Sequence, residues 1–246
     1  MLLGVNIDHI ATLRRGPLRD HAGFLQCGAE CFGRRLCGAK GRGGFHHPPC
    51  PGRPPPHAGC GCPERPGERG PSLNLEMGNT PEMVDFALRL KPDYICMVPE
   101  KREEITTEGG LDAVFHEKDL APTMARMADN GIQVSLFIDP EVPQVEAAAR
   151  LGAPMIELHT GCFANHSGRE RTEELARLKR AAELAHSLGI QVNAGHGINY
   201  QNLEQLLAGV PCPHELNIGH TIVSRALFVG MEQAVREMRQ AIDRLS

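Results

Sequence analysis

Residues 191–198 read QVNAGHGI. Gln191, Val192 and Asn193 have the character of the end of a buried strand, and the small residues after them form a turn that carries one imidazole, His196. Helices are predicted on both sides of the stretch. A strand that ends in a Gly-His-Gly loop and leads into a helix is typical of a (β/α) barrel, because the loops after its strands converge on one catalytic mouth.

The same unit recurs along the chain. Helices predicted at residues 121–130, 141–151 and 171–188 each stop at a glycine that can take the left-handed cap conformation, and a strand begins one or two residues later. A helix at 81–90 has Thr80 as a suitable N-cap. The alternation predicts an α/β fold, a (β/α)8 TIM barrel. Strands are predicted at 2–7, 73–77, 94–98, 133–138, 155–158, from 191 and at 215–218, and the further helices at 202–208, 222–228 and 231–245.

These strands number seven, whereas a closed barrel of this type needs eight. Residues 17–71 lie where the second strand and its helix belong, and they are dominated by Gly, Pro, Arg, Cys and His, with almost no Ile or Val. Such a run cannot bury enough apolar surface to offset its ordering entropy. The chain is therefore predicted to be a single domain over residues 1–246, with its second strand and helix missing or disordered.

Composition excludes several classes of protein. The chain has 246 residues, of which 41% are hydrophobic, and a formal net charge of -4, which gives no reason to expect nucleic acid as a partner. No apolar run approaches the length of a membrane-spanning helix, and the N-terminus turns polar too early for a signal peptide. We expect a soluble cytoplasmic protein. Nine cysteines, an odd number, do not form a secreted disulfide framework, and six of them lie within residues 17–71.

Polar side chains gather at the carboxyl ends of the predicted strands, which one barrel mouth would bring together. Crowded carboxylates would have raised pKa values, which suits Glu76 or Glu157 to proton transfer. The turns at 195–197 and 219–221 have backbone that could hold a phosphate, although their glycines could also serve only the tight turns. A metal site formed by His159, His196 and His220 is an alternative, but the spacing of these residues matches no metal-ligand motif. The polar residues at or just past the carboxyl ends of the predicted strands are Asp8, His9, Glu76, Glu100, Asp139, Glu157, His159, Asn193, His196 and His220.

Seven motifs together resemble the pyridoxine 5′-phosphate synthase family: GVNIDHIATLR, LNLEM, VPEKREEITTEGG, IQVSLFIDP, IELHTG, VNAGHG and ELNIGH. The resemblance covers residues 2–15 and 72–246. It implies a (β/α)8 barrel with extra helices that assembles as a homo-octamer. It also implies a condensation of 3-amino-2-oxopropyl phosphate with 1-deoxy-D-xylulose 5-phosphate that gives pyridoxine 5′-phosphate, phosphate and water, without a redox cofactor or a metal.

The resemblance also implies roles for individual residues. Glu76 in LNLEM matches the general base, His196 in AGHG the general acid, and Glu157 in IELHTG the carboxylate that stabilises the transition state. Arg15 matches a phosphate-binding arginine less directly, because its spacing from Arg14 is two residues shorter than in the family. Substrate contacts are matched by Asn6, Asp8, His9, Arg15 and Thr106, and the phosphate-holding turns by Gly197, Gly219 and His220.

The chain departs from the family at the second strand. There the family carries a run such as VHLREDRRHI, which supplies a further catalytic histidine, and nothing like it stands in this sequence. The same run, written in GC-rich codons and read out of frame, gives a Pro- and Gly-rich sequence close to residues 48–56. We therefore hypothesise that residues 17–71 are translated out of frame, and we assign the missing histidine to none of His46, His47 and His57. Activity is then expected to be impaired.

Two other functions stay open. The Cys- and His-rich segment could be a metal- or partner-binding insertion on an inactive barrel, although Cys60 and Cys62 do not make two CxxC knuckles. The chain could also be another phosphate-handling barrel, a lyase such as an aldolase or an isomerase. The sequence has no lysine late in a strand for Schiff-base chemistry, since Lys101 lies past its strand in a charged loop, and this disfavours an aldolase.

Overall fold

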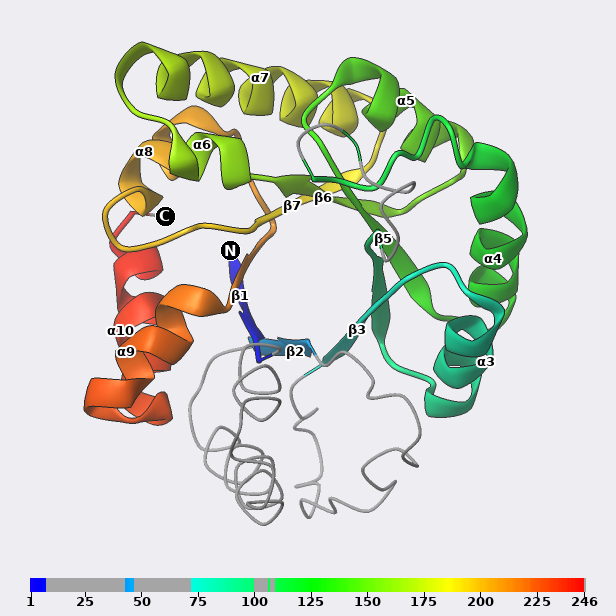
Figure 1. Ribbon diagram of the computed structural model, residues 1–246, viewed down its shortest axis with the longest axis horizontal. Helices are drawn as coiled ribbons and strands as arrows, with labels where there is room; N and C mark the ends of the chain where they lie inside the picture. The colour runs from blue at the N-terminus through cyan, green and yellow to red at the C-terminus, as the bar shows by residue number, and fades with distance from the viewer. Residues whose placement is uncertain (8–42, 47–71, 100–105, 107–108, 246) are drawn as a thin grey trace.

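Eight parallel strands close into a barrel in the computed structural model, in the order β1 to β8 around the ring. Figure 1 shows the helices arranged outside this ring. The structure describes residues 1–7, 43–46, 72–99, 106 and 109–245. The predicted TIM-barrel class is confirmed. All the strands finish at the same end of the barrel, because every strand runs in the same direction, and barrels of this type carry their active sites at that end.

The elements follow the chain in a regular alternation. The strands are β1 Leu2–Asn6, β2 Gly43–His46, β3 Leu73–Met77, β4 Tyr94–Met97, β5 Gln133–Ile138, β6 Met155–His159, β7 Gln191–Gly195 and β8 Glu215–Ile218. The described helices are α3 Pro81–Leu90, α4 Glu117–Asp129, α5 Val142–Arg150, α6 Gly161–Asn165, α7 Gly168–Ser187, α8 Leu203–Gly209, α9 His220–Val229 and α10 Met231–Asp243.

The second strand corrects the prediction that this part of the barrel is missing. The backbone of Gly43–His46 pairs with β1 on one side and with β3 on the other, and so closes the ring. Parallel pairing needs only backbone amides and carbonyls, which any residue except proline supplies in full. A strand with the sequence GGFH has no apolar alternation by which the sequence could predict it. The helix expected after it falls outside the described residues.

The junctions between helices and strands follow the local signals in the sequence. Thr80 caps α3, because its Oγ1 accepts a hydrogen bond from the Met83 amide at 3.3 Å, and Pro81 opens the helix. Each of the three predicted glycine stops adopts a positive φ, between 69° and 76°. This left-handed conformation ends the helix and turns the chain back toward the sheet. The glycines concerned are Gly131, Gly152 and Gly189.

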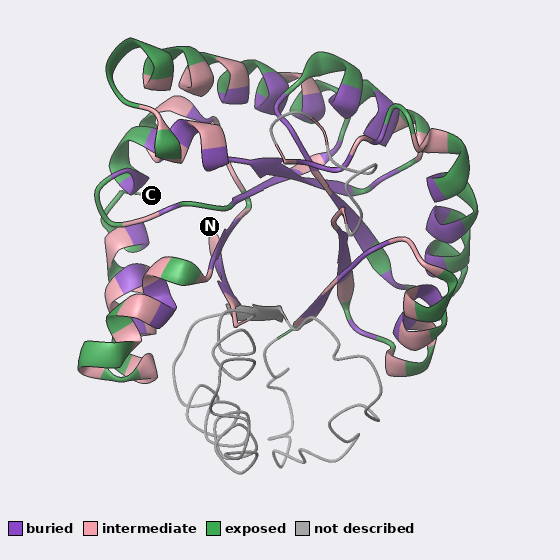
Figure 2. Ribbon diagram, in the orientation of Figure 1, coloured by how far each residue is buried: buried purple, intermediate pink, exposed green. Residues whose placement is uncertain are grey.

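The apolar core lies between the strands and the helices. Buried side chains of alternate strand residues, such as Leu75, Ile95 and Ile156, pack there against helix residues such as Ala87 and Leu178. Figure 2 shows buried residues along the strands and on the helix faces that meet them. No helix among the described residues has the length and apolar character needed to cross a membrane.

The interior of the barrel is polar. Three side-chain hydrogen bonds connect strands that are not neighbours in the ring, namely β1 to β3, β4 to β6 and β6 to β8. Only side chains that point inward can meet in this way, because an intervening strand separates each pair. The interior therefore offers polar groups for chemistry, whereas the apolar layer outside the sheet supplies most of the hydrophobic stabilisation.

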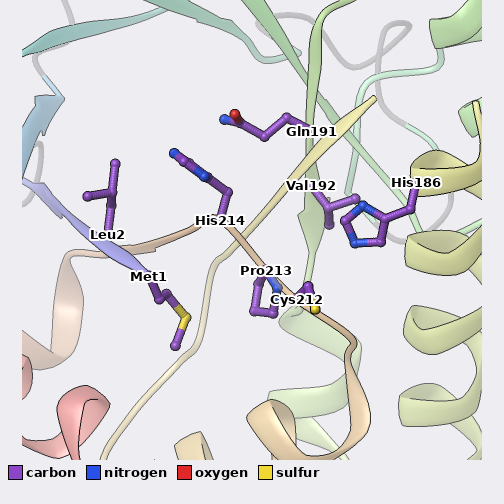
Figure 3. A pocket seen from close by; sticks show the side chains of 8 residues that line it. All are labelled: Met1, Leu2, His186, Gln191, Val192, Cys212, Pro213 and His214. Carbon is purple, nitrogen blue, oxygen red and sulfur yellow. The ribbon is translucent and has the colours of Figure 1, made fainter. Parts of the chain in front are cut away.

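The opposite end of the barrel has a hollow of about 380 Å³. Figure 3 shows its lining side chains, which come from the starts of β1 and β7, the end of α7 and the segment before β8. This is the amino-terminal end of the strands, where conserved features of such barrels serve stability rather than catalysis. The candidate site lies at the other end.

The cap of α3 gives a direct test of the fold. We expect Thr80→Ala to lower the free energy of unfolding by about 1 kcal/mol, because the Met83 amide loses its acceptor at the start of the helix. Denaturant unfolding measures the change. Thr80→Ser keeps the hydroxyl and is the matched control; an equal loss of stability in both variants would show that the hydroxyl does not act as a cap.

Candidate active site

The carboxylate of Glu157 is buried inside the barrel, where the residue is 4% exposed. Its Oε2 accepts a hydrogen bond from the Asn217 amide of β8 at 2.6 Å, and the Cys96 thiol of β4 lies 3.6 Å from the same oxygen. These partners come from the strands two places away on either side of β6. Hydrogen bonds of this kind make a buried carboxylate tolerable.

Gly195 leaves the space that the Glu157 carboxylate occupies. A Cβ atom built on Gly195 would lie 1.9 Å from Oε1 of Glu157, well inside any normal contact. Gly195 pairs with His159 on β6 and with Asn217 on β8 in the strand register. The glycine before His196 is therefore required by the carboxylate beside it, as well as by the turn.

Glu76 lies on β3, near the same thiol. The Asn6 amide donates a hydrogen bond to Oε1 of Glu76 at 2.8 Å, and Glu76 is in register with Cys96 on the next strand. Burial raises the pKa of the Cys96 thiol well above its ordinary value, and the charges of Glu157 and Glu76 raise it further. The two carboxylates therefore act on one thiol, which places both of them in the same part of the barrel interior.

His196 follows β7 at the mouth and adopts an unusual backbone conformation. Its φ is 78°, in the left-handed region that a non-glycine residue rarely takes. The buried Thr160 hydroxyl bridges the carbonyls of Gly195 and His196, at 2.7 and 2.6 Å. The Asn202 amide donates to the Gly197 carbonyl at 3.0 Å. These contacts fix the turn that carries the exposed imidazole.

A second cluster joins Thr106 to the end of β6. The Thr106 hydroxyl and the Gly110 N–H both donate to the buried Asp139 carboxylate, which also lies 3.1 Å from Nδ1 of His159. Burial alone would raise the pKa of Asp139. The hydrogen bonds from His159, Thr106 and Gly110, together with the charge interaction with His159, outweigh it and lower the pKa below its ordinary value. The carboxylate therefore stays ionised at neutral pH.

The two predicted phosphate turns lie side by side. Gly197 has a φ of 78°, and Gly219 is the N-cap of α9, whose first residue is His220. The Thr221 hydroxyl donates to the Ile198 carbonyl at 2.8 Å and so connects the two turns. A helix N-terminus has unpaired N–H groups and a partial positive charge, both suited to an anion. The phosphate assignment itself stays a prediction.

The structure describes most, though not all, of the predicted site residues. Asn6, Glu76, Thr106, Glu157 and His196 lie at or inside the carboxyl end of the barrel, together with the two turns. Glu157 and Asn193 lie within their strands and not at the ends, because β6 and β7 each continue two residues further. The residues outside the described part of the chain are Asp8, His9, Arg15 and Glu100.

Four side chains that shape the site were not predicted as site residues. Asn217 and Cys96 contact Glu157 from strands far away in the sequence, and Thr160 and Asn202 hold the His196 turn. Only the position of Asn217, two residues before the Gly219 turn, could have suggested an inward-facing side chain. Among the described residues, no three or more His, Cys, Asp or Glu side chains are grouped so that they could hold a metal ion.

Solved structures share the fold of this chain. A crystal structure from Coccidioides immitis, provisionally assigned as a fructose-1,6-biphosphate aldolase, aligns with a TM-score of 0.50 at 15% identity, over 72% of each chain. At this identity the match shows the fold alone.

Sequence relatives are much closer. A protein of Akkermansia muciniphila is 75% identical over the full length of both chains, and one of Opitutus terrae is 44% identical over 97% of this chain and 98% of the relative. Both are named pyridoxine 5′-phosphate synthase. The family model described as pyridoxal phosphate biosynthesis protein PdxJ matches residues 69–244, and so begins where the segment at 17–71 ends. The chain belongs to the PdxJ family of pyridoxal phosphate biosynthesis proteins.

Proposed function

We propose that this protein is a pyridoxine 5′-phosphate synthase, an enzyme of vitamin B6 biosynthesis. Its reaction condenses 3-amino-2-oxopropyl phosphate with 1-deoxy-D-xylulose 5-phosphate and gives pyridoxine 5′-phosphate, phosphate and water. The observation that carries the proposal is geometric. Glu76 is in register with Cys96 on the next strand, Glu157 contacts the same thiol across the barrel, and His196 follows Gly195 at the mouth.

The chemistry needs several proton transfers at one place. An amine that condenses with a ketone loses water, so a hydroxyl must leave with a proton and a neighbouring carbon or nitrogen must give one up. His196, exposed at the mouth, is suited to donate the proton to the leaving oxygen. Glu76, oriented by Asn6, is suited to remove the other proton.

Glu157 has a different task in this proposal. Its carboxylate is held by Asn217 and Cys96 and buried in the barrel, so it has little freedom to move. A fixed negative charge in a poorly solvated site stabilises a cationic iminium group without reorganisation. This agrees with a role in stabilising the transition state.

The two connected turns supply the anchor for phosphate. Gly197, Gly219 and His220 are proposed to bind a substrate phosphate through backbone N–H groups and the N-terminus of α9, and Asn6 and Thr106 to contact substrate. Anchoring both substrates by phosphate would turn a bimolecular condensation into a step between held groups. Asp8, His9 and Arg15 complete the proposed binding set.

Assembly and location follow the family resemblance. We propose a homo-octamer of single-domain chains over residues 1–246 that acts in the cytoplasm on phosphorylated small molecules. No resident metal or redox cofactor is required by the proposed chemistry. The segment at 17–71 is proposed to be out of frame, and the match of the family model to residues 69–244 supports this.

The role of Glu76 gives the first functional test. In a chain whose reading frame is restored across residues 17–71, we expect Glu76→Gln to lower turnover about 10²- to 10⁴-fold, because the amide cannot accept the proton. A coupled assay that mixes both phosphorylated substrates and follows pyridoxine 5′-phosphate measures it. Glu82→Gln, the same change at an exposed position of α3, is the control and should leave turnover unchanged. Equal rates for the two variants would remove Glu76 from the mechanism.

The segment at 17–71 gives the second functional test. We expect the chain as written to turn over slowly or not at all, and a chain with the reading frame restored across this segment to gain activity, because the family's second-strand histidine would return. The same assay compares the two proteins. Source DNA in which no reading frame restores the family's run would contradict the hypothesis.

A further inference from the structure

Two buried polar residues at the mouth have no part in the proposed reaction. Asp139, at the end of β5, and His159, the last residue of β6, are 2% and 8% exposed. A buried polar pair is weak evidence for stability, since apolar residues of similar volume often serve as well. What these two residues contact therefore indicates what they do.

Asp139 fixes the ring of His159. A carboxylate only accepts hydrogen bonds, so Nδ1 of His159, 3.1 Å from Oδ1 of Asp139, carries the proton and donates it. The other ring nitrogen, Nε2, faces the Gly161 backbone, where a Cβ atom would lie only 2.5 Å away. The ring is thus fixed through Nδ1, and Gly161 leaves the space that its Nε2 edge occupies.

The ring of His159 in turn contacts His196. The two ring centroids lie 5.0 Å apart in an edge-on arrangement with an interplanar angle of 65°. The Phe137 ring lies 5.1 Å from His159 and 6.5 Å from His196, so the three rings form one cluster. A Cβ atom on Gly161 would also lie 3.1 Å from Cδ2 of His196, which shows how closely the three residues approach. The edge of one ring therefore limits how the other can turn.

We propose that His159, oriented by Asp139, is a positioning residue for His196, and that Asp139 at the same time positions Thr106. One buried pair then sets both the general acid and a substrate contact. The Thr106 hydroxyl and the Gly110 N–H attach the segment between β4 and α4 to the same carboxylate. This assignment rests on the proposed function for the catalytic role of His196, whereas the contacts that it invokes do not.

NMR signals of the His196 ring and the Thr106 methyl group test the two contacts separately, namely that of His159 with His196 and that of Asp139 with Thr106. His159→Asn keeps an N–H that can donate to Asp139 but removes the ring beside His196. Loss of a neighbouring ring shifts the His196 signals by itself, so the readout is the orientation of the His196 ring, taken from the nuclear Overhauser contacts of its protons to Gly161. We expect His159→Asn to change this orientation and to leave the methyl signal of Thr106 in place. Asp139→Asn should change both. His186→Asn, the same substitution at the opposite end of the barrel, should change neither.

These outcomes decide the inference without substrate, so a failure of the proposed function would not affect them. An unchanged orientation of the His196 ring in His159→Asn would overturn it, and so would a Thr106 signal that Asp139→Asn leaves in place. In an active chain, His159→Asn should lower kcat about 10²-fold with little change in KM, because the acid is misplaced and binding is kept. Turnover lost in Glu76→Gln but kept in His159→Asn would leave the proposed function standing and refute the positioning role.

Discussion

A carboxylate inside a closed sheet is the constraint on which the rest of the site depends. Glu157 is almost fully buried, and a charge there is tolerated only if its oxygens have partners. Asn217 and Cys96 reach it from strands two places away, and Gly195 has no side chain because the carboxylate fills that space. The barrel interior is therefore polar for the sake of chemistry, and stability comes from the apolar layer between sheet and helices.

One strand end organises most of this geometry. β6 continues into Thr160, so four consecutive residues supply the buried carboxylate, the His159 ring and the hydroxyl that holds the next turn. His196 keeps a left-handed φ of 78°, a conformation that persists only where surrounding contacts determine it. Thr160 fixes its carbonyl and His159 limits its ring, so the backbone and the side chain are constrained separately.

The sequence predicted the elements well where local physics determines them. The strand at 133–138, the α3 cap at Thr80 and the glycine helix stops were confirmed, because periodicity and capping act within a few residues. The short helix α6 and the strand β2 were missed, since neither has a pattern of its own. Asn217 was missed for another reason. Its partner lies 60 residues away, and no local spacing encodes a contact across the barrel.

The second strand shows why closing the barrel and completing the catalytic site are separate requirements. The backbone of β2 pairs with β1 and β3, and this pairing closes the ring. A catalytic histidine must come from the side chain at a particular position, which backbone pairing cannot supply. A chain of this family can therefore keep its barrel while the sequence of one strand changes completely. The fold and the family membership then follow from the seven strands other than β2, whereas the proposed activity depends on the side chains that β2 carries.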